Sequence, residues 1–289
     1  MEDVTFIILT KNEEINLPDC LESVKGFAAR TVVIDSGSTD RTCEIARSMG
    51  AEVYVHPFET HARQFNWALD NVAVTTKWTF RLDADERLTP ALCDELSELM
   101  RVHADDDANG ITMEAWLYFM GKKIRHGCHN KRKLMLFKTG LARSEDRNVD
   151  EHTILSSGHS VTCKERFIHL DFKDLNHWIN KMNWYAEKEM RDYYAYKSDA
   201  GDSDMSGTSD KGILSQRKKK FGLYYRFPMF FRCWLLFVYY YIFRLGFLDG
   251  KEGFVYHWMY HRWYRTLVDA KILEQKISKR PFTDLEDLK

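Results

Sequence analysis

The stretch Trp78-Thr-Phe-Arg-Leu-Asp-Ala-Asp-Glu-Arg87 combines a short apolar run with two acids at its end. Residues 78–82 have the composition of a buried strand, and Asp83 and Asp85 follow at its carboxyl end. In an open α/β sheet the ligand crevice lies outside the carboxyl ends of the strands. Two carboxylates at this spacing can bind one hard cation. The alternative is an ordinary acidic loop before a helix, since an isolated Asp-x-Asp is common.

Outward from this stretch, the first hundred residues alternate between apolar runs and helical patterns. The runs with strand character are 4–10, 31–35, 52–56 and 78–82. Helices are predicted from an N-cap at Asn16 to about residue 25, over 41–49, over 60–71 and from Thr89-Pro90 onward. Strands that alternate with helices indicate βαβ units, so we predict an α/β fold with a Rossmann-like, mostly parallel central sheet and flanking helices.

The pattern changes after His103. Residues 111–119, 122–126, 133–137 and 161–170 have strand character without helices between them. They predict an antiparallel or mixed extension of the sheet, followed by a long helix that Asp174 caps. The basic triplet Lys131-Arg-Lys133 is interpreted as a solvated turn, with an approach to an anionic acceptor as the alternative.

Composition limits the classes of function. The 289 residues carry 42 basic and 43 acidic side chains, so no overall positive charge favours nucleic acid as a partner. Six cysteines are scattered without a CxxC pair, which is typical of reduced thiols in the cytoplasm. The first residues are acidic and lead directly into a strand, unlike a secretory signal peptide.

Aromatic residues crowd into the segment from Phe227 to Leu248. Its longest uncharged run, Cys233 to Phe243, is much shorter than the roughly 20 residues of a membrane-spanning helix. One interpretation is a buried helical subdomain in which Arg232 and Arg244 are paired. The interpretation that we favour is a hairpin of helices that lies in a membrane surface.

A polar segment, residues 197–220, precedes these helices. It is predicted to be a flexible surface loop, and the basic residues 218–220 at its end are expected to meet anionic lipid headgroups. The expected location is therefore cytoplasmic, peripheral on the inner face of the cell membrane.

Three motifs together resemble the inverting family 2 glycosyltransferases of the GT-A fold. They are Thr10-Lys-Asn-Glu13, Asp35-Ser-Gly-Ser-Thr-Asp40 and Asp83-Ala-Asp85, each at the end of a predicted strand. Val149-Asp-Glu-His152 and Gly246-Phe-Leu-Asp-Gly250 resemble a narrower bacterial group. That group includes lipopolysaccharide core and exopolysaccharide glucosyltransferases that work at the cytoplasmic face of the membrane.

The resemblance implies a nucleotide-sugar donor, UDP-linked, and a Mg²⁺ or Mn²⁺ ion. Asp85 corresponds to the main metal ligand, and Asp83 to a contact with the ribose or the metal. His169 resembles the histidine that some GT-A enzymes add as a further metal ligand. Oxygen-rich ligands suit these two cations, and positive charge stabilises a departing diphosphate.

The remaining nucleotide-binding residues also follow from the resemblance. Asp35 resembles the acid that hydrogen-bonds the uracil ring; its alternative, a helix-start turn, is weakened because Asp40 or Thr39 can supply that cap. The residues implied to line the nucleotide pocket are Thr10, Asn12, Glu13, Arg63 and Arg81. For Asn12 a loop-forming role is an equal alternative, Arg63 is balanced against a surface arginine, and Arg81 could simply neutralise the acidic pair.

Inversion needs one general base on the acceptor side, which removes the proton of the attacking hydroxyl. The resemblance places this base at Glu151. Asp150 is the competitor, because adjacent acids cannot be separated without geometry.

We therefore predict a glycosyltransferase that moves a hexose to a lipid-linked or polysaccharide acceptor. Its expected parts are a GT-A domain over 1–172, a helix and basic loop over 173–220, and membrane-associating helices over 221–289. One rival is a polyprenyl-phosphate sugar synthase, whose phosphate acceptor needs no strong base. A second rival is a non-catalytic nucleotide-binding scaffold.

Overall fold

The computed structural model describes residues 1–128, 132–145, 152–197 and 224–278. The chain divides into two compact units, Met1–Lys173 and Asp174–Lys289. The predicted loop and its basic residues 218–220 lie outside the described residues.

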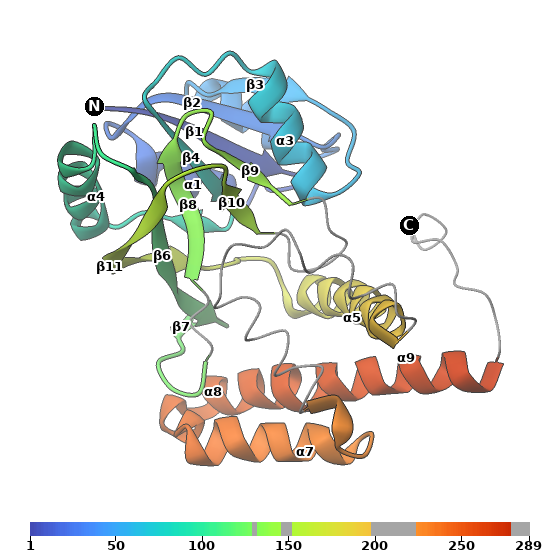
Figure 1. The fold of residues 1–289 in the computed structure, drawn as a ribbon. Helices are drawn as coiled ribbons and strands as arrows, with labels where there is room; N and C mark the ends of the chain where they lie inside the picture. Colours follow the sequence, from blue (N-terminus) through green and yellow to red (C-terminus); the bar gives the residue numbers. More distant parts are fainter. Residues whose placement is uncertain (129–131, 146–151, 198–223, 279–289) are drawn as a thin grey trace. The chain divides into compact units, whose positions relative to one another are not determined.

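The first unit is built on a mixed sheet with the strand order β3-β2-β1-β4-β8-β6-β11-β5, in which β7 pairs with β6 (Figure 1). The strands are β1 Glu2–Thr10, β2 Ala28–Asp35, β3 Glu52–Val55, β4 Trp78–Asp83, β5 Glu86–Arg87, β6 Ala108–Phe119, β7 Lys122–Lys123, β8 Arg132–Lys138 and β11 His159–His169. A separate antiparallel pair consists of β9 Ala142–Ser144 and β10 Thr153–Leu155.

The pairing confirms the predicted α/β class. Strand β1 is parallel to β2 and β4, and β2 is parallel to β3. Strand β8 then runs antiparallel to β4 and β6, and β6 is parallel to β11. The antiparallel strand β8 confirms the mixed extension of the sheet that was predicted after His103. Strands that follow one another without a crossover helix can pair antiparallel.

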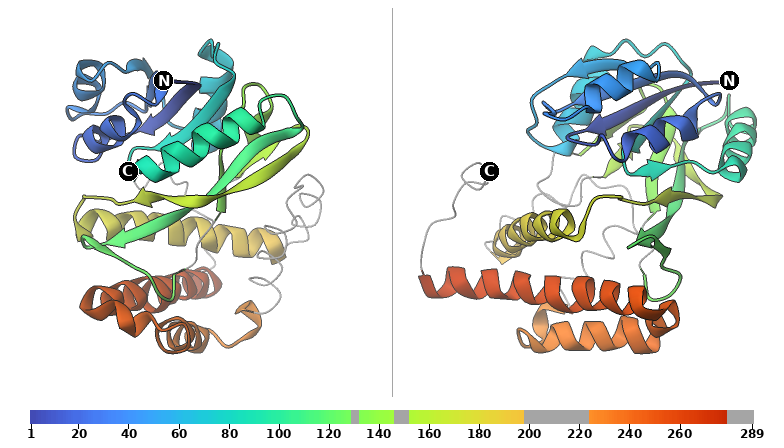
Figure 2. Two further views of the ribbon diagram at one scale, coloured as in Figure 1. Left: turned by 90° about the vertical axis from the view of Figure 1, so that its left-hand side faces the viewer. Right: turned by 180° about the vertical axis from the view of Figure 1, so that it is seen from behind.

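Helices cover both faces of the sheet. They are α1 Leu17–Val24, α2 Thr42–Ser48, α3 His61–Asn71 and α4 Pro90–Val102. Apolar residues of α1, α2 and α4 pack with one set of strand residues, while Phe65 and Ala68 of α3 pack on the opposite face (Figures 1 and 2). The side chains of Thr60 and Thr89 cap α3 and α4, as their positions before an apolar periodic segment predict.

Two local predictions need correction. Asn16 precedes α1, but its side chain makes no capping bond. It bonds Glu13 and Asp171 instead, because both lie within reach once β1 and the end of β11 are in place. The short strands β5, β9 and β10 were not predicted, since two or three residues carry no detectable period.

The second unit is helical. Its elements are α5 Leu175–Lys197, a 3₁₀ turn Tyr224–Arg226, α7 Phe231–Val238, a π-helical turn Tyr239–Phe243, a 3₁₀ turn Gly246–Asp249, α8 Gly250–His257, a π-helical turn Trp258–Trp263 and α9 Tyr264–Ser278. Asp174 caps α5 as predicted, because its Oδ1 accepts the backbone N–H of His177 at 2.8 Å. Helices α5 and α9 share a buried apolar core that includes Met190 and Val268.

A buried ion pair joins α7 to α9. Arg232 and Asp269 have side chains that are 3% and 1% exposed, and the guanidinium bonds both carboxylate oxygens. Asp269 also accepts the backbone N–H of Phe230 at 2.7 Å. Of the two arginines that flank the aromatic run, Arg232 is therefore paired inside the unit, while Arg244 is exposed.

Apolar side chains remain exposed along the helices that follow Phe230. Between residues 231 and 258 the most exposed of them are Phe231, Leu248 and Phe243, at 55%, 55% and 73%. Among the described residues, no single helix is long and apolar enough to cross a bilayer. Phe231–Phe243 and Gly246–Ile277 meet the length and composition criteria only together, and a 70° bend separates them.

The bend has an identifiable cause. Leu245 has a φ of 60°, in the left-handed region, which ends the first helix. A Cβ on the next residue, Gly246, would lie 2.3 Å from the imidazole of His257, so this close approach of two segments requires glycine. The sequence motif at 246–250 is thus the corner of a helical hairpin.

The Arg232–Asp269 pair gives a stability prediction. Asp269→Asn leaves a buried guanidinium without its counter-charge, and we expect it to destabilise the second unit by roughly 3–5 kcal/mol. Hydrogen exchange measured by mass spectrometry should show lost protection in 224–278. Glu98→Gln on α4, which removes an exposed pair with Arg101, is the matched control and should change almost nothing. Equal protection in the two variants would contradict the prediction.

Candidate functional site

Three strand ends meet at one edge of the first unit's sheet. In the parallel register Thr10 of β1 is opposite Asp35 of β2, and Leu9 of β1 is opposite Asp83 of β4. The motifs that lie far apart in the sequence are therefore neighbours in space. This edge is where an open α/β sheet binds its ligand.

The acid at the end of β4, Asp83, lies beside two cations. Lys133 Nζ is 3.6 Å from Asp83 Oδ2. Burial by itself would raise the pKa of Asp83, but the charges of Lys133 and Arg81 outweigh burial and hold that pKa below its ordinary value. Asp83 is therefore an anion at neutral pH, the form that can accept a hydroxyl hydrogen bond or bind a cation.

The second acid, Asp85, faces His169. The Nε2 of His169 is 3.5 Å from Asp85 Oδ2, and its Nδ1 is 3.8 Å from Glu86 Oε1. Burial acts to lower the pKa of His169, but the carboxylates of Asp85 and Glu86 raise it above the ordinary value. The position of His169 follows from the pairing of β11 with β5, where His169 is opposite Glu86.

These side chains fit a particular kind of metal site. Among the described residues, no group of three or more His, Cys, Asp or Glu side chains is arranged to hold a metal ion. Asp85 provides a carboxylate of the kind that Mg²⁺ and Mn²⁺ prefer, and His169 beside it provides an imidazole, which suits Mn²⁺ better than Mg²⁺. Cations of this class commonly take one or two protein ligands and complete their shell with substrate phosphates and water.

Glu86 is a site residue that the sequence analysis did not identify. Its side chain is fully buried, yet its carboxylate faces three polar groups. Glu86 Oε1 is 2.6 Å from Lys133 Nζ and faces His169, while Oε2 accepts the backbone N–H of Asp83 at 2.9 Å. A carboxylate behind a histidine fixes the orientation of the ring. In the sequence, Glu86 is marked as a site residue only by its position directly after Asp83-Ala-Asp85.

Lys133 corrects the interpretation of the basic triplet. It was predicted to lie in a solvated turn, but Arg132 and Lys133 begin strand β8, and Lys131 lies outside the described residues. Lys133 points to the same side of β8 as Met135, so its amino group reaches the acids of the site. Because side chains two residues apart on a strand point to the same face, the position of Lys133 two residues before an apolar core residue could have indicated its direction.

The carboxylate of Asp35 is used within its own loop. Its Oδ2 accepts the backbone N–H groups of Gly37 and Ser38, at 2.9 and 2.7 Å. Its Oδ1 accepts the hydroxyls of Thr10 and Ser38, at 3.1 and 2.5 Å. Asp40 accepts the N–H of Thr42 at the start of α2, which is the capping role foreseen for it. A contact between Asp35 and a uracil ring stays a prediction.

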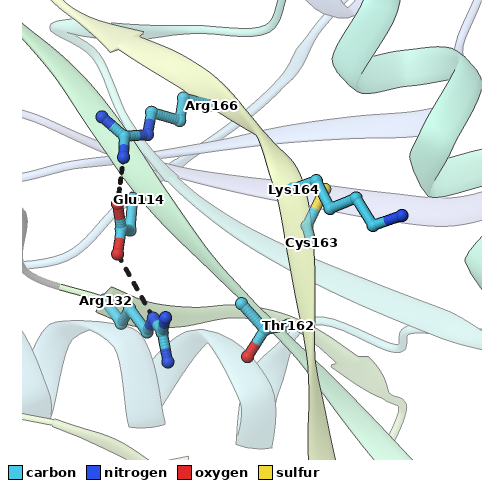
Figure 3. Close-up of a pocket in the computed structure, with 6 residues that line it drawn as sticks. All are labelled: Glu114, Arg132, Thr162, Cys163, Lys164 and Arg166. Atoms are coloured by element: carbon cyan, nitrogen blue, oxygen red, sulfur yellow. Dashed lines mark hydrogen bonds and ion pairs between the residues drawn. The ribbon is translucent and has the colours of Figure 1, made fainter.

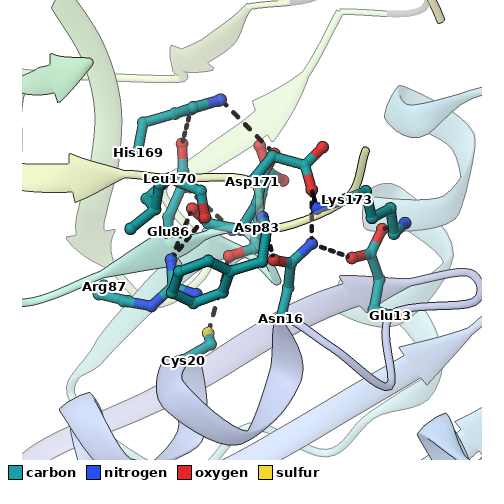
Figure 4. Close-up of polar contacts among 12 residues, drawn as sticks. Glu13, Asn16, Cys20, Asp83, Glu86, Arg87, His169, Leu170, Asp171 and Lys173 are labelled. Atoms are coloured by element: carbon teal, nitrogen blue, oxygen red, sulfur yellow. Dashed lines mark hydrogen bonds and ion pairs between the residues drawn. The ribbon is translucent and has the colours of Figure 1, made fainter. Parts of the chain in front are cut away.

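The other residues of the first motif shape the loop beside β1. Asn12 has a φ of 54°, and its side chain accepts the N–H of Thr39 at 2.8 Å. Glu13 bonds Lys173 at 2.6 Å and Asn16 at 2.9 Å (Figure 4). Burial raises the pKa of Glu13, although both partners act in the opposite direction. Asn12 thus has the loop-forming role given as its alternative, and the nucleoside contacts stay predictions.

The two arginines differ in their surroundings. Arg63 lies in the first turn of α3, pairs with Glu59 at 2.6 Å and has a side chain that is 55% exposed. Arg81 donates to Ser144 Oγ at 3.1 Å, which links β4 to β9. Arg81 also lowers the pKa of Asp83, in agreement with a neutralising role. The surroundings of Arg63 and Arg81 neither support nor contradict a contact with the phosphates of the donor.

The predicted base, Glu151, and its competitor, Asp150, lie outside the described residues. The strands on either side of them are described: Ser144 of β9 is opposite Thr153 of β10. The side chain of Asn66 on α3 holds β9, because it both donates to and accepts from the backbone of Ser144.

Comparisons with known proteins agree with this geometry. Residues 5–158 match the family model described as glycosyl transferase family 2. An uncharacterized glycosyltransferase of Rickettsia bellii is 26% identical over 297 residues, which cover 99% of this chain and 91% of the relative. The lipopolysaccharide core biosynthesis glycosyltransferase LpsC of Rhizobium meliloti is 32% identical over 142 residues, 47% of this chain and 51% of LpsC.

Solved structures are similar over a smaller part. Glucosyl-3-phosphoglycerate synthase from Mycobacterium tuberculosis, in complex with Mn²⁺, UDP and glucosyl-3-phosphoglycerate, has a TM-score of 0.32 and 20% identity. The match covers 40% of this chain and spans 44% of that chain, less than half of either.

The Asp35 loop gives a testable consequence. Asp35→Asn replaces an oxygen that accepts two backbone N–H groups or two hydroxyls by a donor, so we expect a loss of about 1.5–3 kcal/mol of stability without any nucleotide. Thermal unfolding measures the loss. Glu59→Gln, whose side chain is 56% exposed, is the control. If Asp35→Asn is as stable as the control but no longer binds UDP, a direct contact between Asp35 and the uracil ring would be indicated instead.

Proposed function

Because the chain belongs to glycosyl transferase family 2, we propose that it transfers a hexose from a UDP-sugar to a hydroxyl group of a lipid-linked or lipopolysaccharide acceptor, with inversion. The observation that carries this proposal is the meeting of Thr10, Asp35 and Asp83 on three neighbouring strands, with Asp85 and His169 beside them. LpsC, a lipopolysaccharide core glycosyltransferase, supports the choice of acceptor class.

The donor half of the reaction follows from the charges at this edge. Asp85 and His169 would hold Mg²⁺ or Mn²⁺, which supplies positive charge for the departing diphosphate. Asp83, kept ionised by Lys133 and Arg81, is available to the ribose or the metal. Glu86 holds Lys133 and the ring of His169 in place from behind.

The acceptor half requires a base and an approach to lipid. We assign the base to Glu151, with Asp150 as the alternative, so that one of these carboxylates takes the proton of the attacking hydroxyl. The exposed apolar side chains between Phe231 and Trp258 support attachment to the inner face of the cell membrane. Such attachment would keep the enzyme at the surface that carries its acceptor.

The first test is donor hydrolysis by the full chain. UDP-, GDP- and dTDP-sugars are incubated with Mn²⁺, Mg²⁺ or EDTA, and nucleotide release is measured. We expect release of UDP from one sugar, which EDTA and Asp85→Ala abolish. Glu86→Gln should weaken Mn²⁺ binding in the presence of UDP by about 10–100-fold, because it removes the carboxylate behind His169.

Glu98→Gln is the matched control for both acidic variants, since Glu98 lies exposed on α4. Metal-independent release, or full activity of Asp85→Ala, would contradict the assignment of the metal ligands. An absence of both release and nucleotide binding would favour the scaffold.

Membrane attachment is tested by flotation with vesicles of phosphatidylethanolamine and phosphatidylglycerol. Phe243→Glu combined with Leu248→Glu places charges where the side chains are 73% and 55% exposed. We expect recovery with vesicles to fall at least about tenfold, since each apolar side chain gains roughly 1.5–3 kcal/mol on burial. Val55→Glu, at an equally exposed apolar position of β3, should leave recovery unchanged. Undiminished recovery of the double variant would rule out this surface.

A further inference from the structure

A polar pocket lies on β6, β8 and β11, outside the acidic site. Its volume is about 370 Å³. The residues that line it are Glu114, Arg132, Thr162, Cys163, Lys164 and Arg166 (Figure 3). None of these residues has a role in the donor half of the proposed reaction.

The centre of the pocket is a row of three charged side chains across three strands. Glu114 of β6 is opposite Arg132 of β8 and opposite Arg166 of β11. Its Oε1 lies 3.3 Å from Arg132 Nε, and its Oε2 lies 2.6 Å from Arg166 Nη2 (Figure 3). One carboxylate thus orients two guanidinium groups, whose planar forks suit phosphate or carboxylate oxygens.

Positive charge is in excess around this row. The pocket lining contains the guanidinium groups of Arg132 and Arg166 and one carboxylate, that of Glu114, whereas the amino group of Lys164 points away from this row (Figure 3). Beside it, the ring of Trp116 lies 4.3 Å from the guanidinium of Arg166. The same ring lies 3.2 Å from the amino group of Lys123. The positive charge of these side chains would attract an anionic ligand, whereas it would add little to the binding of a neutral ligand.

The pocket shares a face of the sheet with the strands that flank the predicted base. A Cβ on Gly110 would meet both Leu134 of β8 and Leu155 of β10, so β10 covers the face to which Leu134 points. Arg132, two residues from Leu134 on β8, points to the same face. Arg166 and His169 are three residues apart on β11, so their side chains point to opposite faces of the sheet. The pocket therefore opens on the face of the sheet that β10 covers. We take this face as the acceptor side of the proposed reaction, because β10 follows the predicted base in the chain.

We propose that this pocket binds an anionic group, a phosphate or a carboxylate, on the sugar acceptor. The proposal rests on the proposed function for the identity of the acceptor, and on the pocket alone for the anion. Arg132 and Arg166 would hold the anion, and Glu114 would keep both arginines in position when the pocket is empty. An acidic or phosphorylated acceptor sugar would thereby be distinguished from its neutral counterpart.

The test locates binding through Trp116. Its indole N–H signal is assigned in the ¹H–¹⁵N spectrum of the full chain by comparison with Trp116→Phe, and UDP is present to fill the donor site. Glucose 6-phosphate, glucuronic acid and glucose are titrated at constant ionic strength. We expect one or both acids to shift the signal and glucose to leave it unchanged; the acid that binds more tightly identifies the anion.

Arg132→Gln is the principal variant, because its side chain is 62% exposed and is not needed for the core. We expect its dissociation constant for the acid to rise at least about tenfold, the equivalent of one charge-assisted contact. Arg101→Gln, at an exposed position of α4, is the control and should bind like the wild type.

Equal shifts with glucose and the two acids, no shift with any of them, or equal affinities of Arg132→Gln and Arg101→Gln would overturn the proposal. Failure of the donor reaction is a separate result, since it is read from nucleotide release. A protein that binds the acid at Trp116 but releases no nucleotide would keep the anion site and lose its assignment to an acceptor.

Discussion

The candidate site depends on one buried carboxylate. Glu86 has no exposed surface, and a buried charge is stable only when it is paired and hydrogen-bonded. The partners that satisfy it are Lys133 from β8, His169 from β11 and the backbone N–H of Asp83 from β4. Strands from three parts of the chain are therefore held at one point. The acids Asp83 and Asp85 obtain their geometry from this arrangement.

The second unit also contains a buried pair of opposite charges, which here joins two helices instead of several strands. Its core is small and aromatic, and the buried Arg232–Asp269 pair fixes α7 against α9. Pairing Arg232 inside leaves the apolar side chains of the same segment on the outside. A surface of this kind is unfavourable in water unless something covers it. The two interpretations of the aromatic run are thus partly compatible: an internal ion pair and an apolar exterior occur together.

The two polar sites of the first unit differ in the sign of their charge. At the strand ends, carboxylates dominate and Lys133 and Arg81 moderate them. On the face of β6, β8 and β11, Arg132 and Arg166 dominate and Glu114 moderates them. The proposed reaction calls for a donor bound together with a cation and for an acceptor bound by other chemistry. Two oppositely charged sites on one sheet would separate these tasks.

The sequence by itself determined the α/β class, the order of the first four strands, the caps at Thr60, Thr89 and Asp174, and the three motifs that identify the family. These features are local, because an apolar run, a cap or a strand-end acid depends on residues a few positions away. Only the tertiary structure decided which distant side chains meet. Glu86 with Lys133, and Glu114 with Arg132 and Arg166, are joined by the register between strands, and that register is set by the pairing of the whole sheet.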